Sequence, residues 1–64
     1  MKPTLKDEIY AFLHNIKTPV TASWISHSMG IYFYQARENL KILINEGVVK
    51  KIHVGRNRIY YSCL

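Results

Sequence analysis

Cysteine is nearly absent from this 64-residue sequence, which contains a single one, Cys63. One cysteine cannot build an intrachain disulfide framework or a cysteine-based metal cluster, and its scarcity is typical of a reducing compartment. His14, His27 and His53 are scattered, without the i, i+4 spacing that would place two imidazoles on one helical face. The sequence therefore predicts no metal site, and nothing in it indicates another cofactor.

Long apolar runs are also missing. The longest are a few residues, far short of the ~20 that span a bilayer, and "MKPTLKDEIY" at the start lacks the apolar region of a signal peptide. No serine–histidine–acid spacing, nucleophile elbow or phosphate-binding glycine loop is present. We therefore expect a cytoplasmic protein that is not an enzyme and does not enter a membrane.

Acidic residues are scarce, with four against nine lysines and arginines and a formal net charge of +5. The excess of basic over acidic residues is concentrated near the C-terminus. Residues 1–49 carry five basic and four acidic side chains, net +1, whereas residues 50–64 carry four basic side chains and no acid, net +4. A positive pole at one end of a small domain favours an anionic partner, such as nucleic acid or a membrane surface.

No repeat, low-complexity tract or linker interrupts the chain, so residues 1–64 should form one domain around one modest core. A first helix is predicted from about Thr4 to Asn15, because Thr4 and Asp7 match a capping box. Its apolar positions recur at helical spacing and form a single stripe: Leu5, Ile9, Phe12, Leu13 and Ile16.

The remaining elements follow in quick succession. After Pro19, Val20 could form a very short strand, and Thr21 or Ser23 could cap a second helix over residues 22–29, which Gly30 closes. A third helix is predicted over residues 33–45, with Ala36 at the centre of its buried face. Residues 48–54 and 59–63 alternate like strands around the polar stretch 55–58, which is a hairpin signal.

This order of elements, helix, short strand, helix, helix, strand, strand, is that of a winged helix-turn-helix domain. The predicted fold is therefore α+β, with three helices, a short strand and a C-terminal β-hairpin wing. In such a domain the third helix enters the major groove of double-stranded DNA and its N-terminal half meets the base edges. The sequence thus predicts a sequence-specific DNA-binding transcription regulator.

The candidate DNA-binding residues fall in two groups. On and just before the third helix they are Tyr32, Tyr34, Gln35, Arg37, Glu38 and Lys41. Among these, Arg37 could contact guanine, Gln35 adenine and Lys41 a phosphate, while the alternative for Arg37 is an ion pair with Glu38. In the wing the candidates are Lys50, Lys51, His53, Arg56, Asn57 and Arg58, which could reach the DNA backbone or the minor groove.

Three adjacent aromatic residues, Tyr32, Phe33 and Tyr34, cannot all enter one core. Phe33 lies about 60° from Ala36 on a helical wheel and should be the most covered, whereas Tyr34 falls on the outer face. An alternative function is open here: Trp24, Tyr32 and Phe33 could form the interface of a winged-helix protein-interaction module with little affinity for DNA. The sequence leaves open whether Tyr32 and Phe33 face DNA or another protein, and whether the chain forms a homodimer.

Several of these segments resemble the PapI/FaeA family of small winged-helix regulators of fimbrial operons. The similarity rests on "KDEIYAFL" (residues 6–13), "TA" (21–22), Ile25, "YQAR" (34–37), Leu40, Leu43 and "EGVV" (46–49). The resemblance implies a regulator that acts with the leucine-responsive regulatory protein, helping it choose among DNA sites near methylation-controlled sequences. It also implies that Tyr34, Gln35 and Arg37 lie on the recognition helix.

Overall fold

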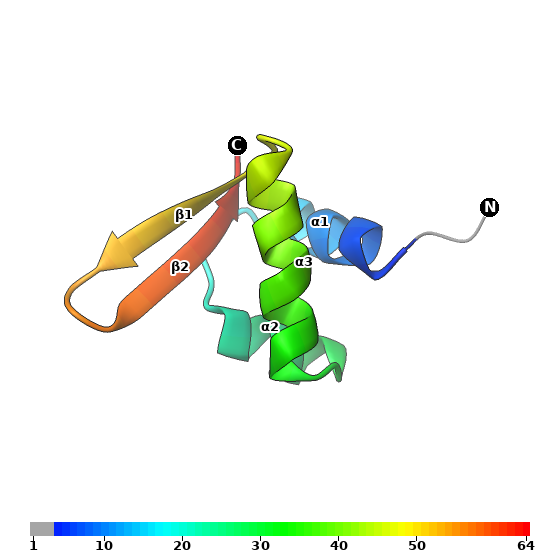
Figure 1. The fold of residues 1–64 in the computed structure, drawn as a ribbon, viewed down its shortest axis with the longest axis horizontal. Helices are drawn as coiled ribbons and strands as arrows, with labels where there is room; N and C mark the ends of the chain where they lie inside the picture. Colours follow the sequence, from blue (N-terminus) through cyan, green and yellow to red (C-terminus); the bar gives the residue numbers. More distant parts are fainter. Residues whose placement is uncertain (1–3) are drawn as a thin grey trace.

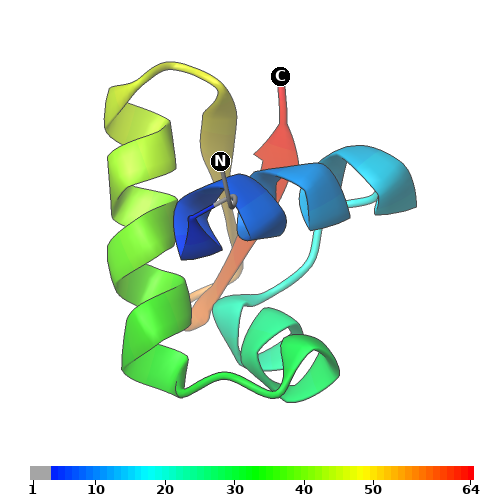
Figure 2. The ribbon, with the colours of Figure 1, turned by 90° about the vertical axis from the view of Figure 1, so that its right-hand side faces the viewer.

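The computed structural model describes residues 4–64, and residues 1–3 lie outside the described part. Three helices, α1 (Leu5–Ile16), α2 (Ala22–Met29) and α3 (Phe33–Asn45), precede the antiparallel strands β1 (Val49–Val54) and β2 (Arg58–Cys63). Figure 1 shows the hairpin projecting sideways from the helices, and Figure 2 shows α1 crossing in front of it, beside α3. This layout confirms the predicted α+β winged helix.

Helix α1 begins and ends one residue later than predicted. Thr4 is the N-cap rather than the first helical residue: its Oγ1 accepts a hydrogen bond from the Asp7 amide at 3.2 Å, and Asp7 Oδ2 accepts one from the Thr4 amide at 3.3 Å. At the other end, Lys17 adopts a left-handed conformation with φ of 55° and its amide bonds to the Leu13 carbonyl at 3.3 Å. The predicted capping box is confirmed.

The predicted short strand at Val20 is a single β-bridge. Val20 and Tyr61 exchange two backbone hydrogen bonds, of 3.0 and 2.7 Å, and the sheet proper has two strands. The extended segment ends there because helix α2 begins at Ala22, with Thr21 as its N-cap and the Thr21 Oγ1 accepting from the Trp24 amide at 3.1 Å. The bridge nevertheless fixes the start of α2 beside strand β2.

The hairpin turn contains three residues, 55–57, rather than the four predicted, because Arg58 already pairs with Val54. Gly55 has a φ of 69°, which a residue without a Cβ adopts at little cost. The register pairs Val49 with Cys63 and Lys51 with Tyr61, so these four side chains share one face of the ribbon. Lys50 pairs with Ser62 and lies on the other face.

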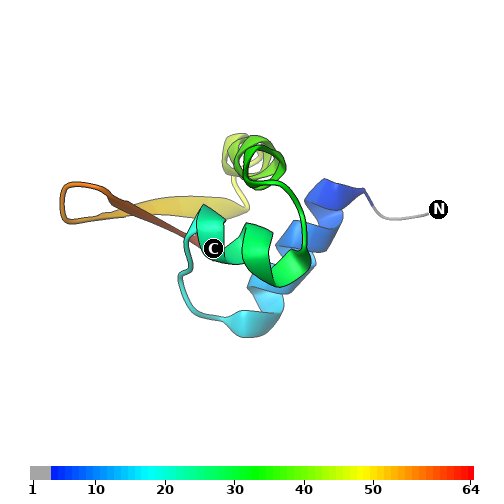
Figure 3. The ribbon, with the colours of Figure 1, turned by 90° about the horizontal axis from the view of Figure 1, so that it is seen from below.

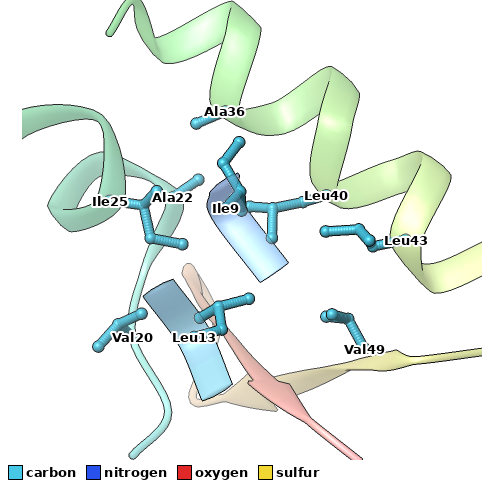
Figure 4. Packing of buried hydrophobic residues seen from close by; sticks show 9 residues of the cluster. All are labelled: Ile9, Leu13, Val20, Ala22, Ile25, Ala36, Leu40, Leu43 and Val49. Atoms are coloured by element: carbon cyan, nitrogen blue, oxygen red, sulfur yellow. The ribbon is translucent and has the colours of Figure 1, made fainter. Parts of the chain in front are cut away.

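Among residues 4–64, nine buried apolar side chains form the core, and Figure 4 shows them converging from every element except β2. Ala36 is fully buried where α3 meets the other helices, which confirms its predicted place at the centre of the buried face. The full set is Ile9, Leu13, Val20, Ala22, Ile25, Ala36, Leu40, Leu43 and Val49. Within residues 4–64, the structure contains no helix with the length and apolarity that a membrane crossing requires.

Leu40→Ala tests this packing. Leu40 is 0% exposed, so the variant should lose about 2–5 kcal/mol of unfolding free energy, a large part of what a small domain has. Ile42→Ala, two residues along the same helix at a side chain that is 45% exposed, is the matched control and should lose less than about 1 kcal/mol. Urea unfolding followed by circular dichroism measures both losses. Equal losses would contradict the arrangement of α3.

Candidate nucleic-acid interface

A groove of about 590 Å³ runs between the outer face of α3 and the hairpin. Figure 3, a view from below, shows α3 nearly end-on, with the hairpin projecting to one side and α2 below α3 in the view. Residues of all three elements line the groove. They are Thr21, Ala22, Ser23, Phe33, Tyr34, Arg37, Glu38, Lys41, Ile44, Lys51, Asn57, Arg58, Ile59, Tyr60 and Tyr61.

The α3 wall of the groove carries four of the six residues predicted for the recognition helix: Tyr34, Arg37, Glu38 and Lys41. Their spacing of three and four residues aligns them along one face of the helix, opposite Leu40 and Leu43 in the core. All four are exposed, so their polar groups face solvent rather than the protein. The inward packing of α3 therefore presents these four side chains to the groove.

Positive charge dominates the groove. Arg37 and Lys41 from α3 and Lys51 and Arg58 from the hairpin face it, against the single carboxylate of Glu38. Within residues 4–64, no ion pair forms between Arg37 and Glu38, because consecutive side chains on a helix point about 100° apart. The groove thus presents cations that no neighbouring carboxylate neutralises in an ion pair.

The one ion pair that the structure forms among residues 4–64 joins Lys6 of α1 to Glu46 at the end of α3. The Lys6 Nζ atom lies 2.6 Å from Glu46 Oε2, and this hydrogen bond raises the pKa of Lys6 above its usual value. Both side chains are partly exposed and neither lines the groove. The pair therefore connects α1 to the end of α3 and neutralises none of the charged side chains that line the groove.

The three adjacent aromatic side chains have separate environments. The rings of Tyr32 and Tyr34 stack on each other, with centroids 5.7 Å apart and planes inclined by 15°. The Arg37 guanidinium lies over the ring of Phe33, 5.8 Å from its centroid. Phe33 is 49% exposed, against 70% for Tyr32 and 64% for Tyr34, so the prediction that Phe33 is the most covered is confirmed.

The Gln35 side chain caps the N-terminus of α3. Its Oε1 accepts a hydrogen bond from the Tyr32 amide at 3.0 Å, and its side chain is outside the groove lining. Bidentate recognition of adenine needs both Oε1 and Nε2 of a glutamine, so that contact would break the cap. The structure therefore favours Gln35 as a helix cap over Gln35 as a base contact.

The predicted wing residues divide between the two faces and the tip of the hairpin. Lys51, Asn57 and Arg58 line the groove, whereas Lys50, His53 and Arg56 do not, although all six are exposed. For Lys50 the reason is the register, which turns every second residue of a strand to the opposite face. Register alone does not sort the other residues, because His53 shares the face of Lys51 and Arg58, which pairs with Val54, shares that of Lys50.

Trp24 lies apart from the other two aromatics of the predicted protein interface. Its ring packs on Phe12 of α1, with centroids 5.6 Å apart, while Tyr32 stacks on Tyr34. Trp24 is 46% exposed and does not line the groove. The proposed aromatic patch is thus divided between the α1–α2 junction and the start of α3.

Sequence reasoning missed the contribution of α2 and of strand β2 to the groove. Thr21, Ala22 and Ser23 form one end of the lining, and Ile59 and Tyr61 supply apolar surface from the hairpin. The sequence predicts a cap at Thr21 or Ser23, but it does not show that the capped end of α2 lines the groove. The strand residues gave no such signal, because their position beside α3 depends on contacts between distant parts of the chain.

Metal-ligating side chains do not cluster in the described part of the chain. Across residues 4–64, no three histidine, cysteine, aspartate or glutamate side chains gather closely enough to hold a metal ion. The Cys63 Sγ atom lies 3.8 Å from the Tyr10 carbonyl oxygen, and burial raises the pKa of this thiol, which disfavours the reactive thiolate.

The family model of the FaeA-like proteins matches residues 5–61, from the first residue of α1 to Tyr61 in β2. The chain belongs to the FaeA-like family. The Dr hemagglutinin AFA-III operon regulatory protein AfaF of Escherichia coli is 35% identical over 51 residues, which cover 80% of this chain. These findings confirm the resemblance indicated by "YQAR" and the motifs around it. The FaeA-like chain described here spans 60% of the length of AfaF.

Substitution of Gln35 tests its capping role. Gln35→Ala removes the acceptor for the Tyr32 amide and should lower the free energy of unfolding by about 0.5–1.5 kcal/mol. Gln35→Glu keeps an acceptor and adds a negative charge at a helix N-terminus, so it should be at least as stable as the parent. Urea unfolding separates the two variants. Unchanged stability in Gln35→Ala would contradict the cap.

Proposed function

We propose that this FaeA-like chain is a sequence-specific DNA-binding regulator of a fimbrial operon, and not an enzyme. The observation that carries the proposal is the convergence of α3 and the hairpin on one groove with four cationic side chains and one carboxylate. A relative named as an operon regulatory protein supports the biological part of the proposal. The two walls of the groove suit two different kinds of DNA contact.

Helix α3 would supply base readout from the major groove. Arg37, near its N-terminal end, can donate two hydrogen bonds to the O6 and N7 atoms of guanine, and Glu38 can accept one from the cytosine amino group. Lys41 lies one turn further along and is better placed for a phosphate. Tyr34 has a phenolic hydroxyl and 64% exposure, so it can also donate to a phosphate oxygen.

The hairpin would hold the backbone beside the reading helix. Lys51 and Arg58 point into the groove from neighbouring strands, and Asn57 adds an amide at the turn. Charged contacts of this kind fix the position of a protein on a duplex without carrying sequence information. Arg56, at the exposed tip, would reach the backbone or the minor groove further out.

A second candidate function is a protein-interaction module, favoured by the half-exposed Trp24–Phe12 pair at the α1–α2 junction. This surface is distinct from the groove, so the chain could bind DNA and a second transcription regulator together, with the leucine-responsive regulatory protein as the partner that the family resemblance implies. A gel shift with duplex DNA and a sizing run separate the two functions. A monomer that binds no duplex would refute DNA binding and favour the module.

Two adjacent lysines test the role of the wing. Lys51→Ala should weaken binding to all duplexes about equally and reduce the slope of log affinity against log salt concentration by roughly 1. Lys50→Ala removes the same charge from the next residue, on the opposite face of the ribbon, and is the matched control with a much smaller expected change. Fluorescence anisotropy across a salt series measures both. Equal effects would mean that the groove face of the wing does not meet DNA.

Arg37→Ala tests base recognition by α3. Loss of a bidentate contact should cost about 1–3 kcal/mol on the preferred sequence and leave binding to unrelated duplex much less affected. Lys41→Ala, on the same helix face, is the comparison, because a phosphate contact should lower both affinities together. The measurement is competition binding with preferred and scrambled duplexes. A uniform loss in Arg37→Ala would contradict its role in base recognition.

A further inference from the structure

Phe33 is an unusual residue to find at the edge of a basic groove. It is the first residue of α3, it lines the groove, and 49% of its surface is exposed, yet it has no polar atom. Burying it on binding would be favourable only against something apolar. The neighbouring aromatics differ, because Tyr32 and Tyr34 carry hydroxyl groups and stack on each other.

Arg37 and Phe33 behave as a pair. They are four residues apart on α3, which places them on one face, and the guanidinium lies 5.8 Å from the ring centroid. A cation over an aromatic face is held by the quadrupole of the ring. In residues 4–64, Arg37 forms no ion pair that competes with this contact. The ring therefore limits the positions that the guanidinium samples before any ligand arrives.

The major groove of DNA offers one ligand to each member of the pair. Guanine presents O6 and N7, which accept two hydrogen bonds from an arginine, and thymine presents a methyl group, which packs against apolar side chains such as phenylalanine. The 5.8 Å between guanidinium and ring lies between one and two base-pair steps of roughly 3.4 Å. The two groups are therefore spaced to reach bases that are adjacent or one position further apart.

We propose that Phe33 and Arg37 form one reading unit, which selects a guanine with a thymine within two base pairs of it. Arg37 contacts the guanine, and Phe33 both holds the guanidinium and covers the thymine methyl group. The proposal rests on the proposed function, since it assumes that α3 enters the major groove. It adds Phe33 as a residue that determines specificity, and it names the chemical group that Phe33 recognises.

The test begins with the duplex that the wild-type protein selects from a random pool. Each thymine within two base pairs of a guanine is then replaced, one at a time, by uracil, which lacks only the methyl group. At one position the wild-type affinity should fall about fourfold, the worth of one buried methyl group. Phe33→Ala should bind the thymine and uracil duplexes equally. Trp24→Ala, which removes a half-exposed aromatic side chain outside the groove, should keep the fourfold preference.

Phe33→Leu provides a second variant, since it keeps an apolar side chain at the start of α3 if Phe33→Ala unfolds. Leucine lacks the aromatic face, so this variant should retain part of the methyl preference but discriminate less against 7-deazaguanine, which has no N7 acceptor for Arg37. Uracil sensitivity that persists in Phe33→Ala, or that is absent at every position in the wild type, would overturn the reading unit while leaving DNA binding intact. Failure of the wild type to bind any duplex would overturn both proposals.

Discussion

The packing of α3 against the other helices is the constraint on which the rest of the structure depends. Ala36, Leu40 and Leu43 are 0–2% exposed and fix both the position and the rotation of the helix. Because α3 has one buried stripe, its rotation decides which side chains face outward. A turn of one residue about the helix axis, about 100°, would move Arg37 and Lys41 out of the groove.

The hairpin depends on two anchors near its base. Val49 is buried in the core, and the Val20–Tyr61 bridge ties strand β2 to the segment before α2. Beyond these anchors, the ribbon projects from the helices with its outer residues exposed, as Figure 1 shows. A polar, charged projection of this kind is costly to bury in a core but well suited to an anionic surface. The hairpin thus places Lys51 and Arg58 opposite α3.

Membership of the FaeA-like family and the geometry of the groove are independent observations, and both are consistent with a regulator. The family match covers residues 5–61 and shows the relatives of the chain. The groove indicates which side chains are placed to contact a ligand. Of the six residues expected on or before the recognition helix, the structure brings four to the groove and assigns Gln35 to the helix cap. Phe33, for which the sequence leaves contact with DNA or with another protein open, also lines the groove.

Local signals predict the order and type of the elements from the sequence, because capping, hydrophobic periodicity and glycine positions act over a few residues. Examples are the Thr4–Asp7 box, the stripe through Ala36, and Gly30. The position of the positive charge along the chain is likewise read from the sequence. The folded structure is needed to show that Val20 makes one bridge, that Lys51 lines the groove while Lys50 does not, and that Phe33 and Arg37 share the groove. These outcomes depend on strand register and helix packing, which are set by contacts between residues far apart in the sequence.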